Sequence, residues 1–206
     1  MNRLGFLWAR TFRREAPIAA LSVPESDLQA DLAGKSVALV GNARALSGAG
    51  EQIDAADLVI RINRAPMPST ESHGTRTDML ALATSLPQRD LERLRPGRIL
   101  WMSPKRKRLS WGLAQSPGFY LHPLEDIARL TATLGAPPTT GLMMIDLLAR
   151  SQAAKVDLWG FDFFASMSLS GSRTAAQVPH DFAAERDFVE RLMATDPRFA
   201  LHSPAG

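Results

Sequence analysis

The stretches VALVGN at Val37–Asn42 and VIRINRAP at Val59–Pro66 decide the fold of this 206-residue chain. Each is an apolar run that breaks into a short polar loop with an asparagine. Continuous apolar runs are typical of buried parallel strands, and the loops beyond their carboxyl ends carry the groups that contact ligands. We therefore expect Asn42 and Asn63 at one sheet edge, where an uncharged amide can bind a phosphate or a sugar. A plain Gly-Asn turn is the alternative.

From Ser36 onward, short strand-like apolar runs alternate with helical patterns. This alternation predicts one α/β domain with a central, mostly parallel sheet flanked by helices. Pro17 is expected to end the first segment, and Ala16–Asp31 is expected to be a connector. The predicted strands are Ser36–Val40, Leu58–Ile62, Asp78–Ala83, Arg98–Met102 and Lys155–Trp159, with a weaker one at Phe119–His122. The predicted helices are Leu86–Leu94, Leu124–Leu134, Gly141–Ser151 and Asp181–Ala194.

The composition is that of an ordinary globular protein with one core. Lys and Arg number 24 and Asp and Glu 21, and a net charge of +3 is too small to argue for a nucleic-acid partner. Cysteine is absent, which excludes disulfides and thiolate metal sites and agrees with a cytoplasmic location. Apolar stretches all fall short of the roughly 20 residues of a membrane span.

The amino end, MNRLGFLWARTFRRE, mixes apolar residues near helical spacing with four arginines. It lacks the apolar centre and cleavage site of a secretory signal. A basic amphipathic segment of this kind is able to lie on an anionic membrane surface, and the alternative is a first helix docked on the core. We expect residues 1–31 to form this segment and a linker, and residues 32–206 to form the globular domain.

The common nucleotide fingerprints are absent. From Gly41 the chain runs GNARALSGAGEQ, which fits neither GxGxxG nor GxxxxGK[ST]. A Rossmann-like oxidoreductase and a P-loop phosphotransferase are therefore disfavoured. Because His, Asp and Glu occur without metal-ligand spacing, no metal cofactor is expected.

A second candidate element is the loop Pro137–Gly141, PPTTG, which precedes the apolar run LMMIDLLAR. A threonine suits the N-cap, and a glycine lets the backbone come close to a ligand. The amino end of the helix then offers unpaired N–H groups and a positive dipole to a phosphate. The alternative is that Thr139 and Thr140 only cap a core helix.

The third element lies near the carboxyl end. The predicted strand KVDLWGFD brings Gly160 to its end, and PHDFAAERDF places His180 before a helix and Glu185 inside it. A histidine there can act as a general base near neutral pH, although a lone histidine is often only a surface residue. The Ser- and Gly-rich stretch Ala165–Pro179 has the length of a functional lid.

Taken in order, these blocks resemble the sialyltransferases of glycosyltransferase family 29, from about Lys35 to Glu190. VALVGNARALSGAGEQIDAADLVIRINRAP resembles the large sialyl motif, PPTTGLMMIDLLARSQAAKVDLWGFD the small motif, and His180 to Glu185 the very small motif. The resemblance implies a single-domain fold of the GT-A (Rossmann-like) type. It also implies an inverting, metal-independent transfer of sialic acid, or a related 2-keto sugar acid, from a CMP-sugar to a glycan hydroxyl.

The same resemblance implies the role of each site residue. The asparagines would bind the nucleotide and its phosphate, the two threonines with the following glycine would hold the ribose and phosphate, and the last glycine would lie beside the cytidine. His180 would take the proton from the acceptor, and Glu185 would support the loop rather than do chemistry. The implied substrate-binding residues are Asn42, Asn63, Thr139, Thr140, Gly141, Gly160 and Glu185.

The sequence departs from the family at three points. Animal members join the large and small motifs by a disulfide, and the corresponding positions here are Val37 and Ala153. Ala43 replaces the usual serine after the first asparagine. The stretch Ala165–Pro179 contains neither His nor Tyr, whereas the family carries a His/Tyr-rich third motif there, and Arg173 is a candidate for a compensating cation.

The densest charge cluster is Pro104–Arg108, PKRKR. An acidic glycan or a lipid headgroup could dock there, and a solvated helix face is the alternative. Trp101 and Trp111 flank the run, and for Trp101, in a predicted strand, we expect a core role.

The implied partners are a CMP-sugar donor and a glycan or lipid-linked oligosaccharide acceptor, at a cytoplasmic location that includes the inner face of the membrane. Two alternatives stay open. One is a transferase that uses CMP-Kdo, because Kdo is another CMP-activated 2-keto acid. The other is a non-catalytic module that binds CMP or a glycan.

Overall fold

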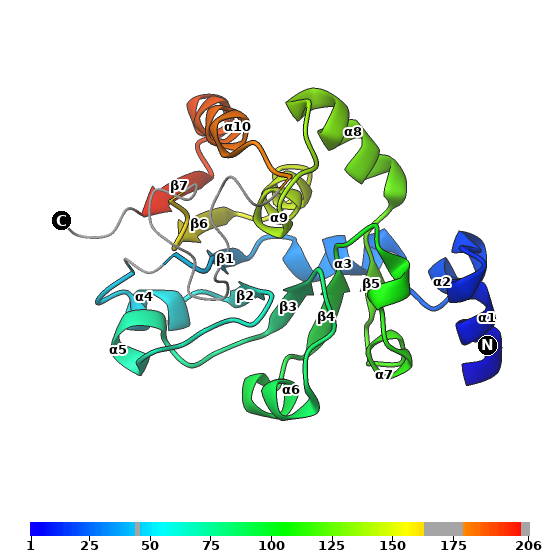
Figure 1. Ribbon diagram of the computed structural model, residues 1–206. Helices are drawn as coiled ribbons and strands as arrows, with labels where there is room; N and C mark the ends of the chain where they lie inside the picture. Colours follow the sequence, from blue (N-terminus) through cyan, green and yellow to red (C-terminus); the bar gives the residue numbers. More distant parts are fainter. Residues whose placement is uncertain (44–45, 163–178, 203–206) are drawn as a thin grey trace.

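A single seven-stranded sheet organises the molecule (Figure 1). The computed structural model describes residues 1–43, 46–162 and 179–202. The strand order is β5-β4-β3-β2-β1-β6-β7, and each neighbouring pair is parallel. This confirms the predicted α/β class. The strands are β1 Ser36–Val40, β2 Leu58–Ile62, β3 Met79–Leu82, β4 Arg98–Trp101, β5 Tyr120–Leu121, β6 Lys155–Trp159 and β7 Phe199–His202.

The point in the sheet at which successive strands are added on opposite sides lies between β1 and β6. From β1 the chain adds β2 to β5 on one side and then crosses to add β6 and β7 on the other. In open parallel sheets, ligands bind outside the carboxyl ends of the strands at such a switch point. The loops after β1 and β6 are therefore where the topology alone predicts a ligand site.

Helices cover both faces of the sheet, because alternate residues of each strand point to opposite sides and both sets are apolar. Leu39 of β1 packs in the core under one helical layer, whereas Val40 packs in the core under the other. The first layer comprises α3 (Glu25–Leu32), α8 (Leu124–Leu134), α9 (Thr140–Ala149) and α10 (Phe182–Thr195). The other face carries α1 (Arg3–Thr11), α2 (Glu15–Ala19), α4 (Gly50–Asp54), α6 (Gln88–Leu94) and α7 (Trp111–Ala114), with α5 (Thr70–His73) beside α4.

The central helix of the first layer is α9, whose sequence TGLMMIDLLA is apolar on all sides. All its residues except Ala149 are buried, as expected for a helix without a polar face. Its one carboxylate, Asp146, lies 2.6 Å from Arg129 of α8. A buried helix of this kind holds its amino end in one place relative to the sheet.

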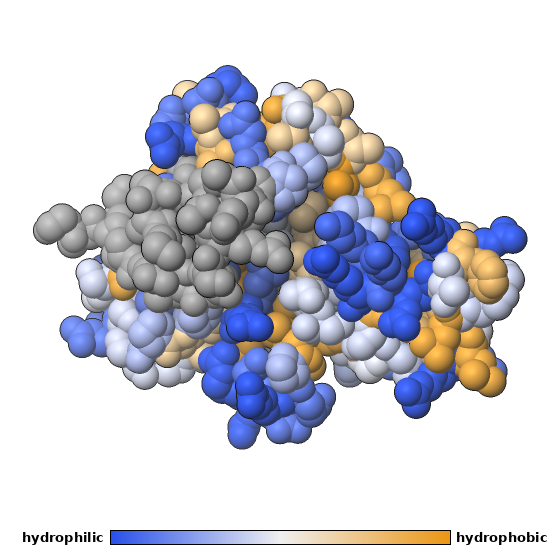
Figure 2. All heavy atoms as spheres, in the orientation of Figure 1, coloured by the Kyte–Doolittle hydropathy of each residue, from blue (hydrophilic) through white to orange (hydrophobic). Residues whose placement is uncertain are grey.

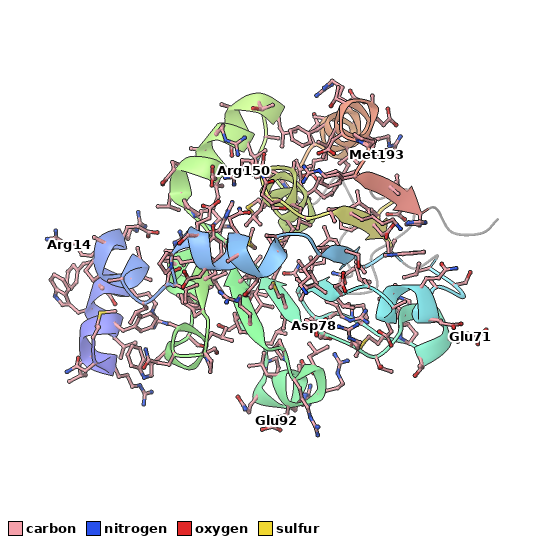
Figure 3. The ribbon with its side chains drawn as sticks, turned by 180° about the vertical axis from the view of Figure 1, so that it is seen from behind. Arg14, Glu71, Asp78, Glu92, Arg150 and Met193 are labelled. Atoms are coloured by element: carbon pink, nitrogen blue, oxygen red, sulfur yellow. The ribbon has the colours of Figure 1, made fainter. Side chains whose placement is uncertain are left out.

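Arg150, immediately after α9, joins three helices (Figure 3). Its guanidinium lies 2.9 Å from Asp126 of α8, 3.3 Å from Glu25 of α3 and 3.2 Å from Asp146 of α9. Charge pairs therefore fasten the carboxyl end of α9, while its amino end stays available to the site described below.

The expected connector at Ala16–Asp31 was wrong, because α2 and α3 lie there. Pro17 does not break the chain but sits in the first turn of α2, where its missing N–H has no intrahelical partner to lose. Ile18, Leu28 and Leu32 are all buried, so both helices form by packing on the core. The division into residues 1–31 and 32–206 stays a prediction.

The basic run after β4 is not a uniformly solvated face. It forms a short 3-10 helix, η1 (Arg106–Arg108), in which Arg106 is buried. The Arg106 guanidinium lies 2.7 Å from Glu15 of α2 and donates to the carbonyl oxygens of Ser103 (2.8 Å) and His122 (2.6 Å). Trp101 is fully buried, which confirms its core role.

The two positions that the resemblance aligns with a disulfide are core positions here. Val37 and Ala153 are both buried and belong to the same apolar cluster. Apolar packing thus occupies both positions. Within residues 1–43, 46–162 and 179–202, no helix combines the length and apolarity that a bilayer span requires.

Candidate active site

The loops after β1 and β6 contact each other through their backbones. Gly41 N–H donates to the Trp159 carbonyl at 2.7 Å, and Ala43 N–H donates to the Gly160 carbonyl at 3.1 Å. A Cβ at Gly41 would lie only 2.3 Å from the Gly160 oxygen, and Gly160 itself has φ +66°. Both positions therefore require glycine, the first for close approach and the second for its backbone conformation.

The amino end of α9 lies against the loop after β6. A Cβ at Gly141 would lie 2.7 Å from the Phe161 ring, so these segments are in direct contact. Thr139 is the N-cap, and its hydroxyl accepts from Leu142 N–H at 3.1 Å. The positive end of the α9 dipole is thus directed at the switch point, the arrangement expected of a phosphate site.

The two predicted asparagines follow adjacent strands. Val40 of β1 pairs with Arg61 of β2, so Asn42 and Asn63 each lie two residues beyond the last pair. Asn63 has φ +52°, a conformation that asparagine tolerates better than most residues, and its Oδ1 accepts from Ala83 N–H at 3.1 Å. The Asn63 side chain therefore also holds the loops after β2 and β3 together.

Glu185 of α10 contacts the N-cap of α9. It is buried and accepts from the Thr139 N–H (2.6 Å) and from the Thr139 hydroxyl (2.7 Å). Burial raises the pKa of the Glu185 carboxyl to about 7, against the lowering effect of these two hydrogen bonds. The contact links the small-motif and very-small-motif segments directly.

His180 makes a second link between the same segments. Its Nδ1 lies 2.7 Å from the carbonyl oxygen of Pro137, at the start of the PPTTG loop. Because a carbonyl oxygen only accepts, we assign the proton to Nδ1 and the lone pair to Nε2. In that tautomer Nε2 is the atom able to accept a proton.

The structure thus brings most of the predicted residues together around the β1–β6 switch point. Gly41 meets Gly160, Gly141 meets Phe161, and α10 is tied to the loop before α9 at two points. Thr140, the first residue of α9, is buried there. Asn63 stands one strand away and bonds the loop after β3 instead. A dipole end, neutral amides and a proton acceptor are what is needed to bind a phosphate-linked donor and deprotonate a hydroxyl.

Sequence reasoning missed a cluster at the ends of β6 and β7. The His202 ring is stacked on Trp159 at 3.8 Å between centroids, with its Nε2 2.6 Å from Asp157 Oδ1. The alternation of Asp157 and Trp159 in β6 is a signal that both side chains share a face. Their partner was missed because the four-residue strand β7 has too short a pattern to be recognised.

A second overlooked residue is Arg61, a charge inside the apolar run of β2. It is buried and donates to the carbonyl oxygens of Arg76 (2.7 Å) and His73 (2.6 Å). Burial lowers the pKa of its guanidinium to about 10. Arg61 therefore braces the segment before β3, and a lone arginine in an apolar strand was the signal for such a role.

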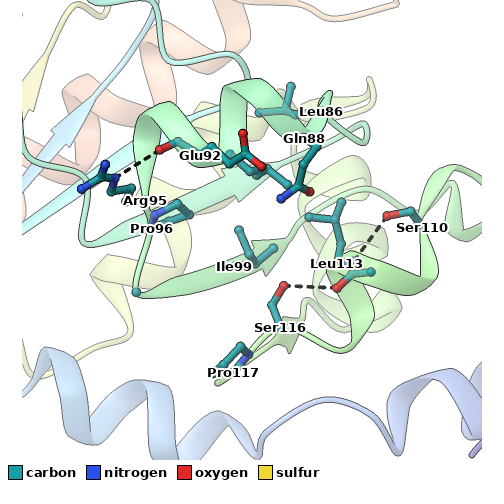
Figure 4. Close-up of a pocket in the computed structure, with 13 residues that line it drawn as sticks. Leu86, Gln88, Glu92, Arg95, Pro96, Ile99, Ser110, Leu113, Ser116 and Pro117 are labelled. Atoms are coloured by element: carbon teal, nitrogen blue, oxygen red, sulfur yellow. Dashed lines mark hydrogen bonds between the residues drawn. The ribbon is translucent and has the colours of Figure 1, made fainter.

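The cavity that the structure shows lies apart from this cluster. A cavity of about 390 Å³ opens between α6 and α7 over β4 and reaches the residues that precede β4 and β5 (Figure 4). None of the predicted site residues lines it. Arg173, the candidate compensating cation, and almost all of Ala165–Pro179 fall outside the described residues.

Comparison with known proteins gives one family match. Residues 14–111 match the model described as glycosyltransferase family 29 (sialyltransferase). That range includes the loops after β1 and β2 and ends before α9, β6 and α10. No curated protein matches the chain significantly.

Solved structures extend the likeness to most of the chain. A mammalian sialyltransferase in complex with Gal-beta-1-3GalNAc-ortho-nitrophenol has a TM-score of 0.60 at 19% identity, covering 84% of this chain and 70% of that chain. A second mammalian sialyltransferase structure has a TM-score of 0.61 at 20% identity, with the same coverage. The sialyltransferase CstII from Campylobacter jejuni, in complex with the substrate analogue CMP-3FNeuAc, has 0.52 at 14%, covering 81% of this chain and 80% of that chain. At these identities the likeness shows a shared fold.

Proposed function

Since this chain is a sialyltransferase-like protein of glycosyltransferase family 29, we propose that it moves sialic acid from a CMP-sugar to a glycan hydroxyl. One observation carries the proposal. The loop after β1, the loop after β6, the amino end of α9 and the start of α10 converge at the switch point of the sheet. These are the segments in which the chain carries the large, small and very small motifs.

The donor would lie across the carboxyl ends of β1 and β6. The close backbone contact of Gly41 and Gly160 leaves no side chain there, which supports a place for the cytidine. Neutral amides from Asn42 and Asn63 suit the nucleotide and its phosphate because they donate hydrogen bonds without charge. Thr139, Thr140 and Gly141 would then hold the ribose and phosphate at the amino end of α9.

The reaction proposed is a single displacement with inversion. The acceptor oxygen forms a bond to the anomeric carbon as the bond from that carbon to the CMP phosphate breaks. Because CMP is a good leaving group, the negative charge that develops needs aimed dipoles rather than a strong acid. The amino end of α9 supplies such a dipole, and we propose on this ground that the transfer is metal-independent.

His180 is the proposed general base. Its Nδ1–H is held by the Pro137 carbonyl, so the Nε2 lone pair would accept the proton that leaves the acceptor hydroxyl. Glu185 would act through Thr139, as a positioning residue for the amino end of α9. Loss of a positioned base typically costs roughly 10²–10⁴-fold in rate.

The test is CMP release from CMP-sialic acid and from CMP-Kdo, measured side by side with mixed glycan acceptors, with and without EDTA. We expect release from CMP-sialic acid that EDTA leaves unchanged. His180→Ala should lower kcat roughly 10²–10⁴-fold and leave CMP affinity intact. Glu190→Gln, an exposed site on the same helix, is the control and should retain the wild-type rate.

Other outcomes identify the alternatives. Release only from CMP-Kdo would make the protein a Kdo transferase. CMP binding without release from either donor would indicate a non-catalytic module, and NADH binding without CMP binding an oxidoreductase. A His180→Ala variant with the wild-type rate would remove His180 from the mechanism. We also propose a glycan or lipid-linked oligosaccharide as the acceptor and a cytoplasmic site of action.

A further inference from the structure

Helix α1 carries two apolar faces, and only one of them is covered. Phe6 and Ala9 are fully buried, and the Phe6 ring lies 5.3 Å from that of Trp111. On the other side Leu4, Trp8 and Phe12 follow one another at intervals of four residues, which aligns them along the helix. The docked face holds α1 on the core, and the second face needs another explanation.

The uncovered face is large and concentrated. Leu4 is 76% exposed, Phe12 61% and Trp8 52%, and Met1 beside them is 49% exposed. Among the described residues, Leu124 is the only other large hydrophobic residue that is exposed, at 37%. We call Met1, Leu4, Trp8 and Phe12 the apolar stripe. Contiguous apolar surface of this kind marks a docking site more often than scattered single residues do.

Positive charge borders the apolar stripe. Arg3, Arg13 and Arg14 are all exposed, and the Arg14 guanidinium lies 5.6 Å from the Trp8 ring (Figure 3). The first acidic residue of the chain is Glu15. Its carboxylate pairs with the buried Arg106 and not with any of these three arginines.

The basic surface continues from α1 into η1. Arg10 of α1 donates to the Leu109 carbonyl at 2.9 Å, which places the two segments side by side. Lys105, Lys107 and Arg108 are exposed on this loop. In Figure 2, hydrophobic residues at the α1 end of the molecule lie next to hydrophilic ones. Apolar side chains bordered by cations match a surface that is apolar beneath an anionic layer.

We propose that α1 docks on an anionic phospholipid surface. The apolar stripe would enter the boundary between headgroups and acyl chains, where an indole is favoured, and the arginines would pair with lipid phosphates. A second copy of the chain is a poorer match, because pairing two such faces would bring the arginines of both copies together.

Docking in this way also orients the candidate active site. The loop with η1 follows the carboxyl end of β4, at the same edge of the sheet as the loops after β1 and β6. Strands are spaced about 4.8 Å apart, so β4 and β1 are roughly 15 Å apart. A lipid-borne acceptor would meet this edge beside the bilayer. That orientation rests on the proposed function, whereas the docking itself does not.

The test is co-flotation of the full chain with vesicles of phosphatidylcholine alone or mixed with phosphatidylglycerol. We expect binding to the mixed vesicles. Trp8→Ser with Phe12→Ser should weaken it about ten-fold or more for each side chain. Arg13→Gln with Arg14→Gln should weaken it about five-fold for each arginine, and added salt should do the same. The matched controls, Leu124→Ser and the pair Arg89→Gln with Arg191→Gln, should bind as the wild type does.

The outcomes separate docking from catalysis and from misfolding. The changed residues are exposed, so circular dichroism and transfer to a soluble acceptor should stay at wild-type levels in every variant. Failure of the folded chain to float with anionic vesicles, or flotation that the stripe variants leave unchanged, would overturn the proposal. A dimer in sedimentation that depends on the stripe, without vesicle binding, would show a second copy as the occupant instead.

Discussion

Glu185 carries a carboxyl group whose buried position disfavours the ionised form. Only 3% of the residue is exposed, and its hydrogen-bond partners are the N–H and hydroxyl of Thr139. The pKa of about 7 means that near neutral pH the group is divided between its two forms. The protonated form can donate to the Thr139 hydroxyl and still accept from the N–H, so it keeps both contacts.

Replacement of Glu185 by glutamine should change how stability depends on pH. The folded pKa of about 7 lies above the ordinary value of 4.5, so the contribution of Glu185 to the free energy of unfolding is fully present below pH 4.5 and is lost as the pH rises to 7. Glutamine imitates the protonated form at every pH. In the wild type, this titration lowers the free energy of unfolding by about 3 kcal/mol between pH 4.5 and pH 7, and we expect that decrease to be absent in Glu185→Gln.

The measurement is urea unfolding at a series of pH values across this window. Glu190→Gln on the exposed side of α10 is the control and should keep the wild-type pH profile. A Glu185→Gln profile parallel to that of the wild type would show that the buried carboxyl does not titrate in this range.

The loops after β1 and β6 contact each other through backbone atoms. A substitution that adds one methyl group there therefore tests how closely they approach. The Gly41–Gly160 contact joins two strands that are distant in the sequence and adjacent in the sheet. The amino end of α9 lies next to the same loop through Phe161. A change at Gly41 should therefore affect binding more than a change at an ordinary loop position.

Gly41→Ala should separate the ends of β1 and β6. Its Cβ would meet the Gly160 carbonyl oxygen at 2.3 Å, and a backbone atom cannot turn aside as the end of a side chain can. We expect a loss of about 1–3 kcal/mol in stability and weaker CMP binding. Thermal unfolding and calorimetric titration with CMP measure the two effects.

Gly112→Ala in α7 is the matched control. A Cβ added at Gly112 would meet no atom within 4 Å outside its own helix, so alanine there should leave CMP affinity unchanged and raise stability by about 0.5–1 kcal/mol. If Gly41→Ala behaves like Gly112→Ala, the two strand ends do not form the tight contact described.

At the scale of the whole molecule, Arg106 connects the amino-terminal helices to the sheet. It pairs with Glu15 of α2 and binds carbonyl oxygens of Ser103, after β4, and His122, after β5. Three segments that are far apart in the sequence thus share one buried cation. The surface that carries α1 depends on this junction.

Arg106→Met should cost about 3 kcal/mol of stability, because it leaves buried acceptors without a donor. Lys107→Met, one residue away and exposed, should stay within about 0.5 kcal/mol of the wild type. Chemical denaturation of both variants makes the comparison. Equal effects would mean that the whole run is solvated.

The fold and most of the site's location followed from the sequence alone, because local patterns encode them. Val37–Val40 and Val59–Ile62 are apolar at every position but Arg61, which is characteristic of strands buried on both faces. The N-cap at Thr139 likewise has a local signal. The roles assigned to Asn42, Asn63 and His180 stay predictions, because they depend on how a substrate is bound and not on a local pattern.

Only the tertiary structure decided which of two similar residues in the same local pattern is buried. Arg106 and Lys107 are neighbours in one basic run, yet only Arg106 is buried, because Glu15 lies opposite it. Phe6 and Trp8 are both aromatic residues of one helix, yet Phe6 is buried against Trp111 of α7, whereas Trp8 is 52% exposed. Periodicity reports which residues share a face of an element. Which face another element covers depends on contacts between segments far apart in the chain.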